Sequence, residues 1–261
     1  MVSFKIGRAT QNRIERIYLF YGMDYFIRYY GSKMGILWAF LNPFLKILIY
    51  YFVFSYIIYR QSNPEFLLKL FAGMLLWQFF TEATSHAIHL FNSRRFILQN
   101  IQINKVDFFI SDILSKFMGL FVNILIYLLF AFLFFNKVYG LEILFLPIVV
   151  FNFLLFTLGV MFILSTMYIR FRDLDHLWTI VIMAGFWTVP IVWDYKIVLQ
   201  NIPQLTYNPL MSYFVNVQEI LIDNHLPTVS TFLYGFIFSV SISIIGYFYM
   251  KFGSRKALEV L

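Results

Sequence analysis

The feature that most constrains this sequence is a series of apolar segments, each about long enough to cross a lipid bilayer as a helix. The segments lie near residues 36–58, 66–90, 108–135, 143–169, 177–193 and 229–250. A bilayer core about 30 Å thick needs roughly 20 apolar residues per helical span. We therefore expect an all-α integral membrane protein with six transmembrane helices joined by short connections.

The composition agrees with a chain that is almost entirely membrane domain. Apolar residues make up 61% of the 261 residues and charged residues only 13%, and 34 phenylalanines and 18 tyrosines are more than a soluble core would bury. We expect a single transmembrane domain over 1–261. Within it, 1–34 would form a cytoplasmic tail and interface helix, 36–250 the six-helix membrane region, and 251–261 a second cytoplasmic tail.

The distribution of basic residues predicts the orientation of the chain. Residues 1–15 contain no run of seven or more apolar residues, so they lack the hydrophobic region of a cleavable signal peptide, and we expect the N-terminus in the cytosol. The outer segments would then carry only Arg60, Lys137 and Lys196. The inner segments would carry fourteen basic residues: Lys5, Arg8, Arg13, Arg16, Arg28, Lys33, Arg94, Arg95, Lys105, Arg170, Arg172, Lys251, Arg255 and Lys256. This excess predicts that both termini are cytoplasmic, and topology explains the net charge of +7 better than nucleic-acid binding does.

An amphipathic pattern over residues 13–30 predicts a helix that lies in the membrane interface. Its less polar side consists of Ile14, Tyr18, Tyr21, Tyr25 and Tyr29. The opposite side carries Arg13, Arg16, Asp24 and Arg28. Tyrosine suits the interface because its ring is apolar and its hydroxyl can stay in contact with water.

A second amphipathic segment follows the fifth span. Asn208 can cap a helix whose first turn contains Pro209. One face would consist of Leu210, Phe214, Val217 and Leu221, and the other of Ser212, Asn216, Glu219 and Asp223. We expect a short outer helix, either at the mouth of a pore or packed as an ordinary surface helix on the bundle.

The first apolar segment contains a helix breaker and a cation. Pro43 frees the carbonyl of Ala39, so we expect a kink there. Lys46 lies about ten residues from the inner end of its segment, and Glu82 of the antiparallel second segment lies about nine residues from its own inner end, so the two charges have similar depth. We hypothesise that Lys46 and Glu82 form an intramembrane charge pair or share a water-filled cavity. Snorkelling of Lys46 to the headgroups is the alternative.

Polar residues occupy the inner half of the second segment: Thr81, Glu82, Thr84, Ser85, His86 and His89. We expect this half to face an aqueous conduit or a second copy of the chain. His86 and His89 are three residues apart, but no third ligand is evident, so we predict no metal site. Asp112 and Lys116 are spaced as an ordinary helical ion pair, and we assign them no chemistry.

Five stretches occur in an order that resembles one known family. They are "RYYGSKMGILWAFLNPFLKILIYYFVF", "FAGMLLWQFFTEAT", "NSRRFILQNIQINKVDFF", "FRDLDHLWTIVIMAGFWTVPIVW" and "YNPLMSYFVNVQEIL". The most specific parts are the Gly-x-Leu-Trp-x-x-x-x-Pro pattern from Gly35 to Pro43 and the Phe-Arg-Asp junction at 171–173. Together these stretches resemble the permease subunits of bacterial ABC-2 type transporters that export lipid-linked polysaccharides such as O-antigens, capsules and wall teichoic acids.

The resemblance implies a half-transporter in the bacterial cytoplasmic membrane. Two copies of the chain would form a conduit, and two copies of a separate nucleotide-binding ATPase subunit would drive it. The sequence contains no Gly-x-x-x-x-Gly-Lys-Ser/Thr phosphate loop, so we expect ATP and Mg²⁺ to bind the partner ATPase and no cofactor to bind this chain. The expected substrate is a polyprenyl-pyrophosphate-linked glycan, most simply an O-antigen.

The resemblance also implies a contact with the ATPase, through the stretch 92–106 and the FRDLDH turn. The residues concerned are Arg94, Arg95, Phe96, Ile97, Leu98, Gln99, Asn100, Arg172 and Asp173. The apolar cluster within this polar stretch belongs to no span, as is typical of a knob that enters a groove on another protein. The alternative is that Arg94 and Arg95 only face lipid headgroups.

Two further sets of residues are implied for the substrate. Sugar rings stack on aromatic side chains, so the candidates for the glycan channel are Trp38, Trp77, Phe79, Phe80, Trp187 and Trp193. Arg28 and Lys33 are the candidate cations for the lipid pyrophosphate, although anionic headgroups would attract the same residues.

Two other classes of function stay open from the sequence. A permease of the same superfamily that exports drugs or small lipids would keep the partner ATPase, and a membrane-embedded glycosyl or acyl transferase would need none. The transferase is less favoured, because the outer carboxylates have no histidine near them except His225. The absence of cysteine also excludes a thiol nucleophile and disulfides.

Overall fold

The computed structural model describes residues 8–29, 37–53, 64–100, 103–195 and 203–257. Within these ranges the regular elements are helices and no strand occurs. The all-α class that the sequence predicts is therefore confirmed for the described part of the chain.

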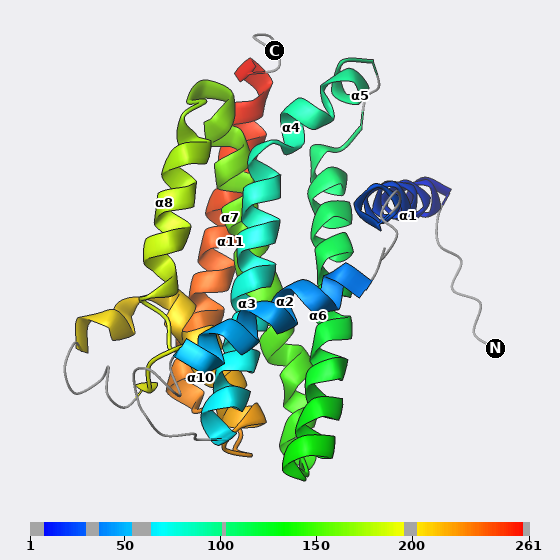
Figure 1. Ribbon diagram of the computed structural model, residues 1–261. Helices are drawn as coiled ribbons and strands as arrows, with labels where there is room; N and C mark the ends of the chain where they lie inside the picture. Colours follow the sequence, from blue (N-terminus) through cyan, green and yellow to red (C-terminus); the bar gives the residue numbers. More distant parts are fainter. Residues whose placement is uncertain (1–7, 30–36, 54–63, 101–102, 196–202, 258–261) are drawn as a thin grey trace.

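Four long apolar helices form the body of the molecule and run side by side (Figure 1). They are α3 (Pro64–Ile88), α6 (Lys105–Phe135), α7 (Leu146–Arg170) and α11 (Val229–Ala257). The shortest have 25 residues. At about 1.5 Å per residue, such helices exceed the roughly 30 Å of a bilayer core. Four of the six expected spans are thus present as helices of sufficient length.

The burial pattern of these helices fits a lipid-exposed bundle around a central helix. In the most apolar 18-residue stretch of α3, 67% of the residues are buried, whereas in the corresponding stretches of α6 and α11 only 17% are buried. Leu125, Leu129 and Phe132 on α6 are all exposed. A continuous apolar surface of this kind is unfavourable in water and suits contact with lipid chains.

Glycines allow α7 and α11 to pack closely. A Cβ atom on Gly159 would lie 2.7 Å from the backbone of Ile242 and of Ser243, and one on Gly246 would overlap the carbonyl oxygen of Gly159. Small residues at helix contacts let backbones approach in membranes, where packing replaces the hydrophobic effect as the driving force. The two helices make the most extensive helix–helix contact in the described structure.

The first apolar segment forms α2 (Leu37–Phe52), which packs against α3 and crosses the bundle obliquely (Figure 1). The helix is continuous on both sides of Pro43, whose side chain lies outside the described residues. Residues 54–63 also lie outside them. The full extent of the first expected span, 36–58, therefore stays a prediction.

The fifth apolar segment forms a shorter helix than the sequence predicts. α8 spans Leu174–Phe186, and its 13 residues extend over only about 20 Å. The helix ends before Pro190, because proline lacks an amide donor and disfavours helical geometry in the residue before it. The prediction of one continuous helix to residue 193 is wrong, and residues 189–192 are instead buried in the bundle.

The segment after the fifth span forms α10 (Pro209–Leu221). As predicted, Asn208 caps it, accepting a backbone hydrogen bond of 3.1 Å. On the predicted polar face, Ser212 and Asn216 are both buried. α10 packs against α11, α7 and α3, and its polar side contacts a neighbouring helix, as where Thr231 Oγ1 lies 2.9 Å from Asn216 Oδ1.

Three shorter helices lie at one end of the bundle, which we call the α4–α5 end (Figure 1). They are α1 (Arg8–Tyr29), which runs across the bundle axis beside α6, α4 (Leu90–Ser93) and α5 (Arg95–Asn100). The last turns of α11 reach the same end. Two 3-10 helices, η2 (Leu141–Phe145) and η3 (Pro203–Tyr207), precede α7 and α10.

Candidate functional site

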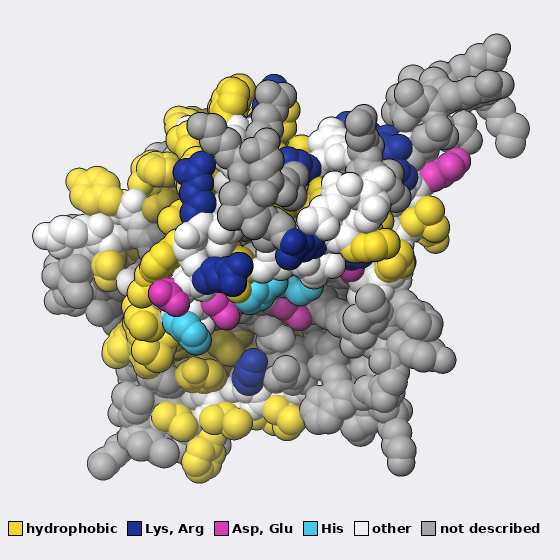
Figure 2. Space-filling model, turned by 90° about the horizontal axis from the view of Figure 1, so that it is seen from above, with side chains coloured by type: hydrophobic (Ala, Val, Ile, Leu, Met, Phe, Trp, Pro, Cys, Tyr) yellow, Lys and Arg dark blue, Asp and Glu magenta, His cyan; other side chains and the backbone are white. Residues whose placement is uncertain are grey.

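Charged and histidine side chains gather at the α4–α5 end. Figure 2 views the molecule from this end and shows basic, acidic and histidine side chains close together, with apolar side chains towards the margin. The basic residues on helix ends and loops here are Arg94, Arg95, Lys105, Arg170, Arg172 and Lys251. This is the end that the distribution of basic residues predicts to face the cytosol, and the orientation itself stays a prediction.

The residues of α4 and α5 that the resemblance implies for ATPase contact divide into an exposed and a buried set. The exposed set consists of Arg95, Phe96, Gln99 and Asn100. Phe96 has 79% of its surface exposed, which is unusual for an aromatic ring outside the lipid-exposed spans. Ile97 and Leu98 are half-buried and pack on the apolar core, and Arg94 is buried. An exposed ring on a short helix anchored by its neighbours has the geometry of an interface anchor.

Arg94 joins the α4–α5 segment to α1. Its guanidinium forms an ion pair with Asp24, and the two side chains are only 10% and 11% exposed. The same guanidinium lies 5.5 Å from the ring centroid of Phe20, within cation–π distance. The Phe20 ring in turn lies 4.8 Å from that of Phe108 on α6. The buried Arg94 side chain therefore ties the α4–α5 segment to α1, and the Phe20 ring of α1 continues this contact to α6.

Burial has a measurable consequence for Asp24. Loss of hydration raises the pKa of Asp24 above its usual 3.8, and the positive charge of Arg94 opposes that shift without cancelling it. Asp112 raises the same pKa further, whereas Lys116 and His86 lower it. The ionised form of Asp24 therefore depends on the neighbouring cations.

A second set of ion pairs fixes α1 to the start of α6. Arg13 Nε donates to Asp107 Oδ1 at 2.7 Å, and Arg16 Nη2 lies 3.4 Å from Asp107 Oδ2. Asp107 is fully buried, in the first turn of α6, where the helix N-terminus favours a negative charge. Asn104 caps this turn by accepting a 3.1 Å hydrogen bond from the Val106 amide.

The predicted ion pair of Asp112 and Lys116 is present, but it is buried and has a third member. His86 Nδ1 lies 2.8 Å from Asp112 Oδ1 and 3.0 Å from Lys116 Nζ. The side chain of Asp112 is 0% exposed and that of Lys116 is 7% exposed. The three side chains connect α3 to α6. Asp112 and Lys116 lie further along α6 than Asp107, towards the middle of the bundle.

His89 connects α3 to α8. Its Nε2 lies 3.5 Å from Asp175 Oδ2, and its ring lies edge-to-face on Tyr168 of α7, with centroids 4.8 Å apart. The exposed loop residues Arg172 and Asp173 precede this contact, so both stretches implied for ATPase contact lie at the same end. Among the described residues, no group of three or more potential ligands is placed to hold a metal ion.

The six aromatic residues implied for the glycan channel differ in their surroundings. Trp77, Phe79 and Phe80 are buried and contact rings of α7, α8 and α10. Trp187 and Trp193 are 49% and 40% exposed. The side chain of Trp38 lies outside the described residues. In the described structure, Trp187 and Trp193 are therefore the two of this set that a ligand can reach.

The remaining predicted charges are placed only in part. Lys46 is exposed on α2, and Glu82 is half-buried on α3, against which α2 packs. Their pairing stays a prediction. The side chain of Arg28 and the whole of Lys33 lie outside the described residues, so the predicted pyrophosphate site stays a prediction as well.

Sequence reasoning did not identify the contacts that Asp24 and Asp107 make. It placed Arg13, Arg16, Asp24 and Arg28 together on the polar side of an interface helix. In the structure Arg13 and Arg16 are partly exposed and pair with Asp107, Asp24 pairs with Arg94, and Tyr18 is 71% exposed. The available signal was the acidic Asp107 in a helical first turn, with no lysine or arginine one turn away in sequence to pair with it.

Comparison with known proteins agrees with the resemblance seen in the motifs. No known protein-family model matches the sequence. The chain is 29% identical over 209 residues to an O-antigen export system permease protein RfbA of Klebsiella pneumoniae, with 78% of each chain covered. A second such protein of Klebsiella pneumoniae is 26% identical over 209 residues, again with 78% of each chain covered. One of Myxococcus xanthus is 27% identical over 207 residues, with 77% of each chain covered. The similarity to polysaccharide-export permeases is thus confirmed along most of the chain.

Proposed function

We propose that this chain is the membrane-spanning permease half of an ATP-driven exporter that moves a lipid-linked polysaccharide, most simply an O-antigen, across the bacterial cytoplasmic membrane. The observation that carries the proposal is the similarity to O-antigen export permeases over 78% of the chain. The four long apolar helices supply the scaffold that such a permease needs. The chain acts as a transport subunit, and the chemistry of ATP hydrolysis belongs to a partner.

The partner is a nucleotide-binding ATPase, because the sequence contains no phosphate loop of its own. We assign the contact to α5, where the exposed Phe96 ring would enter an apolar groove and Arg95 and Gln99 would meet its polar rim. Arg172 and Asp173, at the same end, form the second part of the contact. Two copies of the chain and two ATPase subunits complete the exporter.

The buried ion pairs give a route by which motion of α5 reaches the membrane helices. Arg94 ties the α4–α5 segment to Asp24 of α1, and Arg13 and Arg16 tie α1 to Asp107 of α6. Removing one partner of a buried pair typically costs about 3–5 kcal/mol, so these helices move together more easily than they separate. ATP-driven displacement of α5 would then shift α1 and α6 as one unit and open the conduit.

The glycan path rests on the residues that the sequence motifs implied. Arg28 and Lys33 would hold the lipid pyrophosphate at the inner leaflet, and Trp187 and Trp193 would offer ring faces to the sugars. Lys46 and Glu82 would pair within the membrane or share a hydrated cavity in the dimer. This path requires six spans with both termini in the cytosol.

Deletion of the gene in its own organism tests the proposal. We expect lipid-linked glycan to accumulate inside the cell and to disappear from the surface, and the wild-type gene on a plasmid to restore export. If the glycan is no longer made, the chain is a transferase. If surface glycan is unchanged, the substrate is a drug or another lipid. Either of these results would overturn the proposal.

A further inference from the structure

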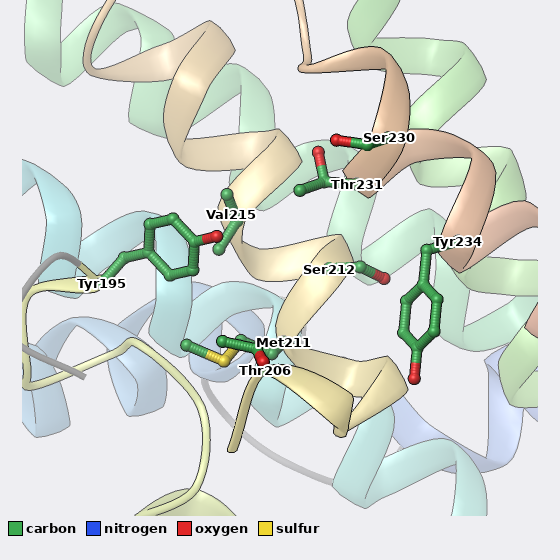
Figure 3. Close-up of a pocket in the computed structure, with 8 residues that line it drawn as sticks. All are labelled: Tyr195, Thr206, Met211, Ser212, Val215, Ser230, Thr231 and Tyr234. Carbon is green, nitrogen blue, oxygen red and sulfur yellow. The ribbon is translucent and has the colours of Figure 1, made fainter. Parts of the chain in front are cut away.

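A pocket of about 160 Å³ lies between α10 and the first turns of α11 (Figure 3). Hydroxyl groups from four segments line it: Tyr195, Thr206, Ser212, Ser230, Thr231 and Tyr234. Met211 and Val215 of α10 provide the apolar part of the lining. Since a water molecule occupies about 30 Å³ of liquid, the space holds about five waters, or one small polar ring in their place.

The walls of the pocket are fixed before any ligand arrives. The Tyr213 hydroxyl of α10 donates to the Gly235 carbonyl of α11 at 2.8 Å and lies 2.7 Å from Ser239 Oγ. The Tyr234 hydroxyl donates to the Tyr207 carbonyl at 2.6 Å, which ties α11 to η3. Cross-links of this kind make a pre-formed cavity, as is usual for small-ligand sites.

The lining offers both hydrogen-bond acceptors and donors. Ser212 donates to the Pro209 carbonyl at 2.7 Å, and Tyr234 donates to Tyr207, so each hydroxyl oxygen keeps lone pairs for a ligand. Among the described residues, the hydroxyls of Tyr195 and Ser230 make no hydrogen bond and are available to donate. A ligand that both donates and accepts through several hydroxyl groups matches this arrangement.

Thr231 adds a hydroxyl to the lining whose oxygen can accept from a ligand. Thr231 Oγ1 lies 2.8 Å from the Thr228 carbonyl oxygen and 2.9 Å from Asn216 Oδ1, and its single proton goes to one of these two acceptors. The hydroxyl oxygen therefore keeps lone pairs for a ligand that donates a hydrogen bond.

The described lining of the pocket is uncharged. None of the eight lining residues that the structure describes is a lysine, arginine, histidine, aspartate or glutamate. The nearest acid in sequence on α10, Glu219, uses its carboxylate oxygens to accept from the Thr228 amide at 2.9 Å and the Thr228 hydroxyl at 2.8 Å. A phosphate or a uronate would find no counter-charge among the described residues of the lining, and burying an unpaired charge is strongly unfavourable.

The position of the pocket relates it to the exit side of the membrane. Tyr234 lies only about 8 Å along α11 from Val229, the first residue of the helix, at the end opposite α4 and α5. With the α4–α5 end in the cytosol, as the proposed function requires, the pocket lies near the outer surface. We infer that it binds one neutral sugar unit, such as a hexopyranose, of the exported polysaccharide, with ring hydroxyls on the hydroxyl lining and a C–H face on Met211 and Val215. This inference rests on the proposed function.

Site-specific labelling tests the inference cleanly because the sequence contains no cysteine. Ser230→Cys places a single thiol in the pocket lining. Val229→Cys is the matched control, one residue earlier, with a side chain that is 71% exposed and does not line the pocket. The purified full chain, in nanodiscs free of sugar-based detergent, is reacted with a polar maleimide. The probe is the neutral oligosaccharide released from the surface glycan of the host, and an oligosaccharide of glucuronic acid is the charged comparison.

At a neutral-probe concentration of about five times its Kd, we expect the labelling of Ser230→Cys to slow about sixfold, because only the empty pocket reacts. The labelling of Val229→Cys should not change, and the charged probe should protect neither position. Unchanged labelling of Ser230→Cys with the neutral probe, or equal protection at both positions, would overturn the pocket assignment. Equal protection of Ser230→Cys by the charged probe would overturn the preference for neutral sugars.

Export by whole cells separates failure of this inference from failure of the proposed function. Ser230→Trp fills the pocket and should reduce surface glycan relative to Val229→Trp, with both variants at equal levels in the membrane. If deleting the gene blocks export but the probe does not protect Ser230→Cys, only the pocket assignment is wrong. If deleting the gene leaves surface glycan unchanged, the proposed function fails whatever the labelling shows, and the inference fails with it.

Discussion

The buried ion pair of Arg94 and Asp24 predicts a strong energetic coupling between the α4–α5 segment and α1. Both side chains are about nine-tenths buried, so the loss of one partner leaves the other charge in a poorly hydrated site. After Arg94→Ala, Asp24 can take up a proton. Protonating a carboxyl group of the usual pKa, 3.8, at pH 7 costs at most about 4 kcal/mol, since each pH unit between the pKa and the pH adds about 1.4 kcal/mol. Because burial already raises this pKa, we expect Arg94→Ala to destabilise the fold by about 2–4 kcal/mol.

A double-mutant cycle isolates the pair from other effects of each substitution. We expect Asp24→Ala to cost a similar amount, because Arg94 cannot lose its proton, and the double variant to cost about 2 kcal/mol less than the sum of the two. The measurement is reversible unfolding of the purified chain in mixed micelles, followed by circular dichroism. Arg95→Ala, at the exposed neighbouring position, is the control and should stay within about 0.5 kcal/mol of wild type. A coupling below about 0.5 kcal/mol would refute the reasoning.

The same pair predicts a dependence on pH. A folded-state pKa that is raised above 3.8 means that folding favours protonated Asp24. The stability that folding gains from this preference is fully present at pH values below the pKa of Asp24 in the unfolded chain. It is lost as the pH rises through the pKa of Asp24 in the folded chain. Removing Arg94 raises the folded pKa further, so this loss extends to higher pH. We expect the deficit of Arg94→Ala to be smaller at about pH 5 than at about pH 8. An equal deficit at both would show that Asp24 is not the charge left unpaired.

Three other variants, one of them a double substitution, test separate parts of the structure. Phe96→Asp should abolish surface glycan. Phe252→Asp, which replaces another exposed ring at the same end of the bundle, on α11 and outside the proposed contact, should retain surface glycan at an equal membrane level. Equal export by the two variants would remove α5 from the ATPase contact. The double variant Arg13→Ala with Arg16→Ala should destabilise the chain by about 2–3 kcal/mol. This loss should exceed the sum of the losses in the two single variants, because either arginine alone can still pair with buried Asp107. Additive losses in the unfolding titration would contradict this. Gly159→Ala should lower the free energy of unfolding by about 2 kcal/mol or more, because the added Cβ atom meets the α11 backbone. Gly22→Ala is the control: its Cβ atom would have nothing within 4 Å, so the free energy of unfolding should rise by up to about 1 kcal/mol. Equal effects would show that α7 and α11 can separate freely.

Local patterns in the sequence predicted what depends on local physics. Span length predicted four of the long helices, since the thickness of the bilayer sets the same minimum for each. The cap at Asn208 and the helical pair of Asp112 and Lys116 also followed from short-range geometry, and both are present. The end of α8 is also local, because Pro190 stops the helix, and the prediction that the helix continues to residue 193 is wrong.

Long-range contacts could not be predicted from periodicity. Hydrophobic spacing indicates which side of a helix is apolar, but for α10 it does not indicate what the polar side contacts. In the structure Ser212 and Asn216 on that side are buried against neighbouring helices, with Thr231 of α11 2.9 Å from Asn216. The partners of Asp24 and Asp107 lie 70 to 94 residues away in sequence, at Arg94, Arg16 and Arg13. The packing of α1 on α6 and on the α4–α5 segment brings these charges together.

Transport by inside-out membrane vesicles tests the central claim most directly. Vesicles that contain the chain and its ATPase would be supplied with lipid-linked glycan and ATP, and the fraction of glycan protected from an added glycosidase would be measured. We predict ATP-dependent protection that requires the chain, that Phe96→Asp abolishes and that Phe252→Asp leaves intact. Equal protection in vesicles that lack the chain would contradict the claim that it forms the export path.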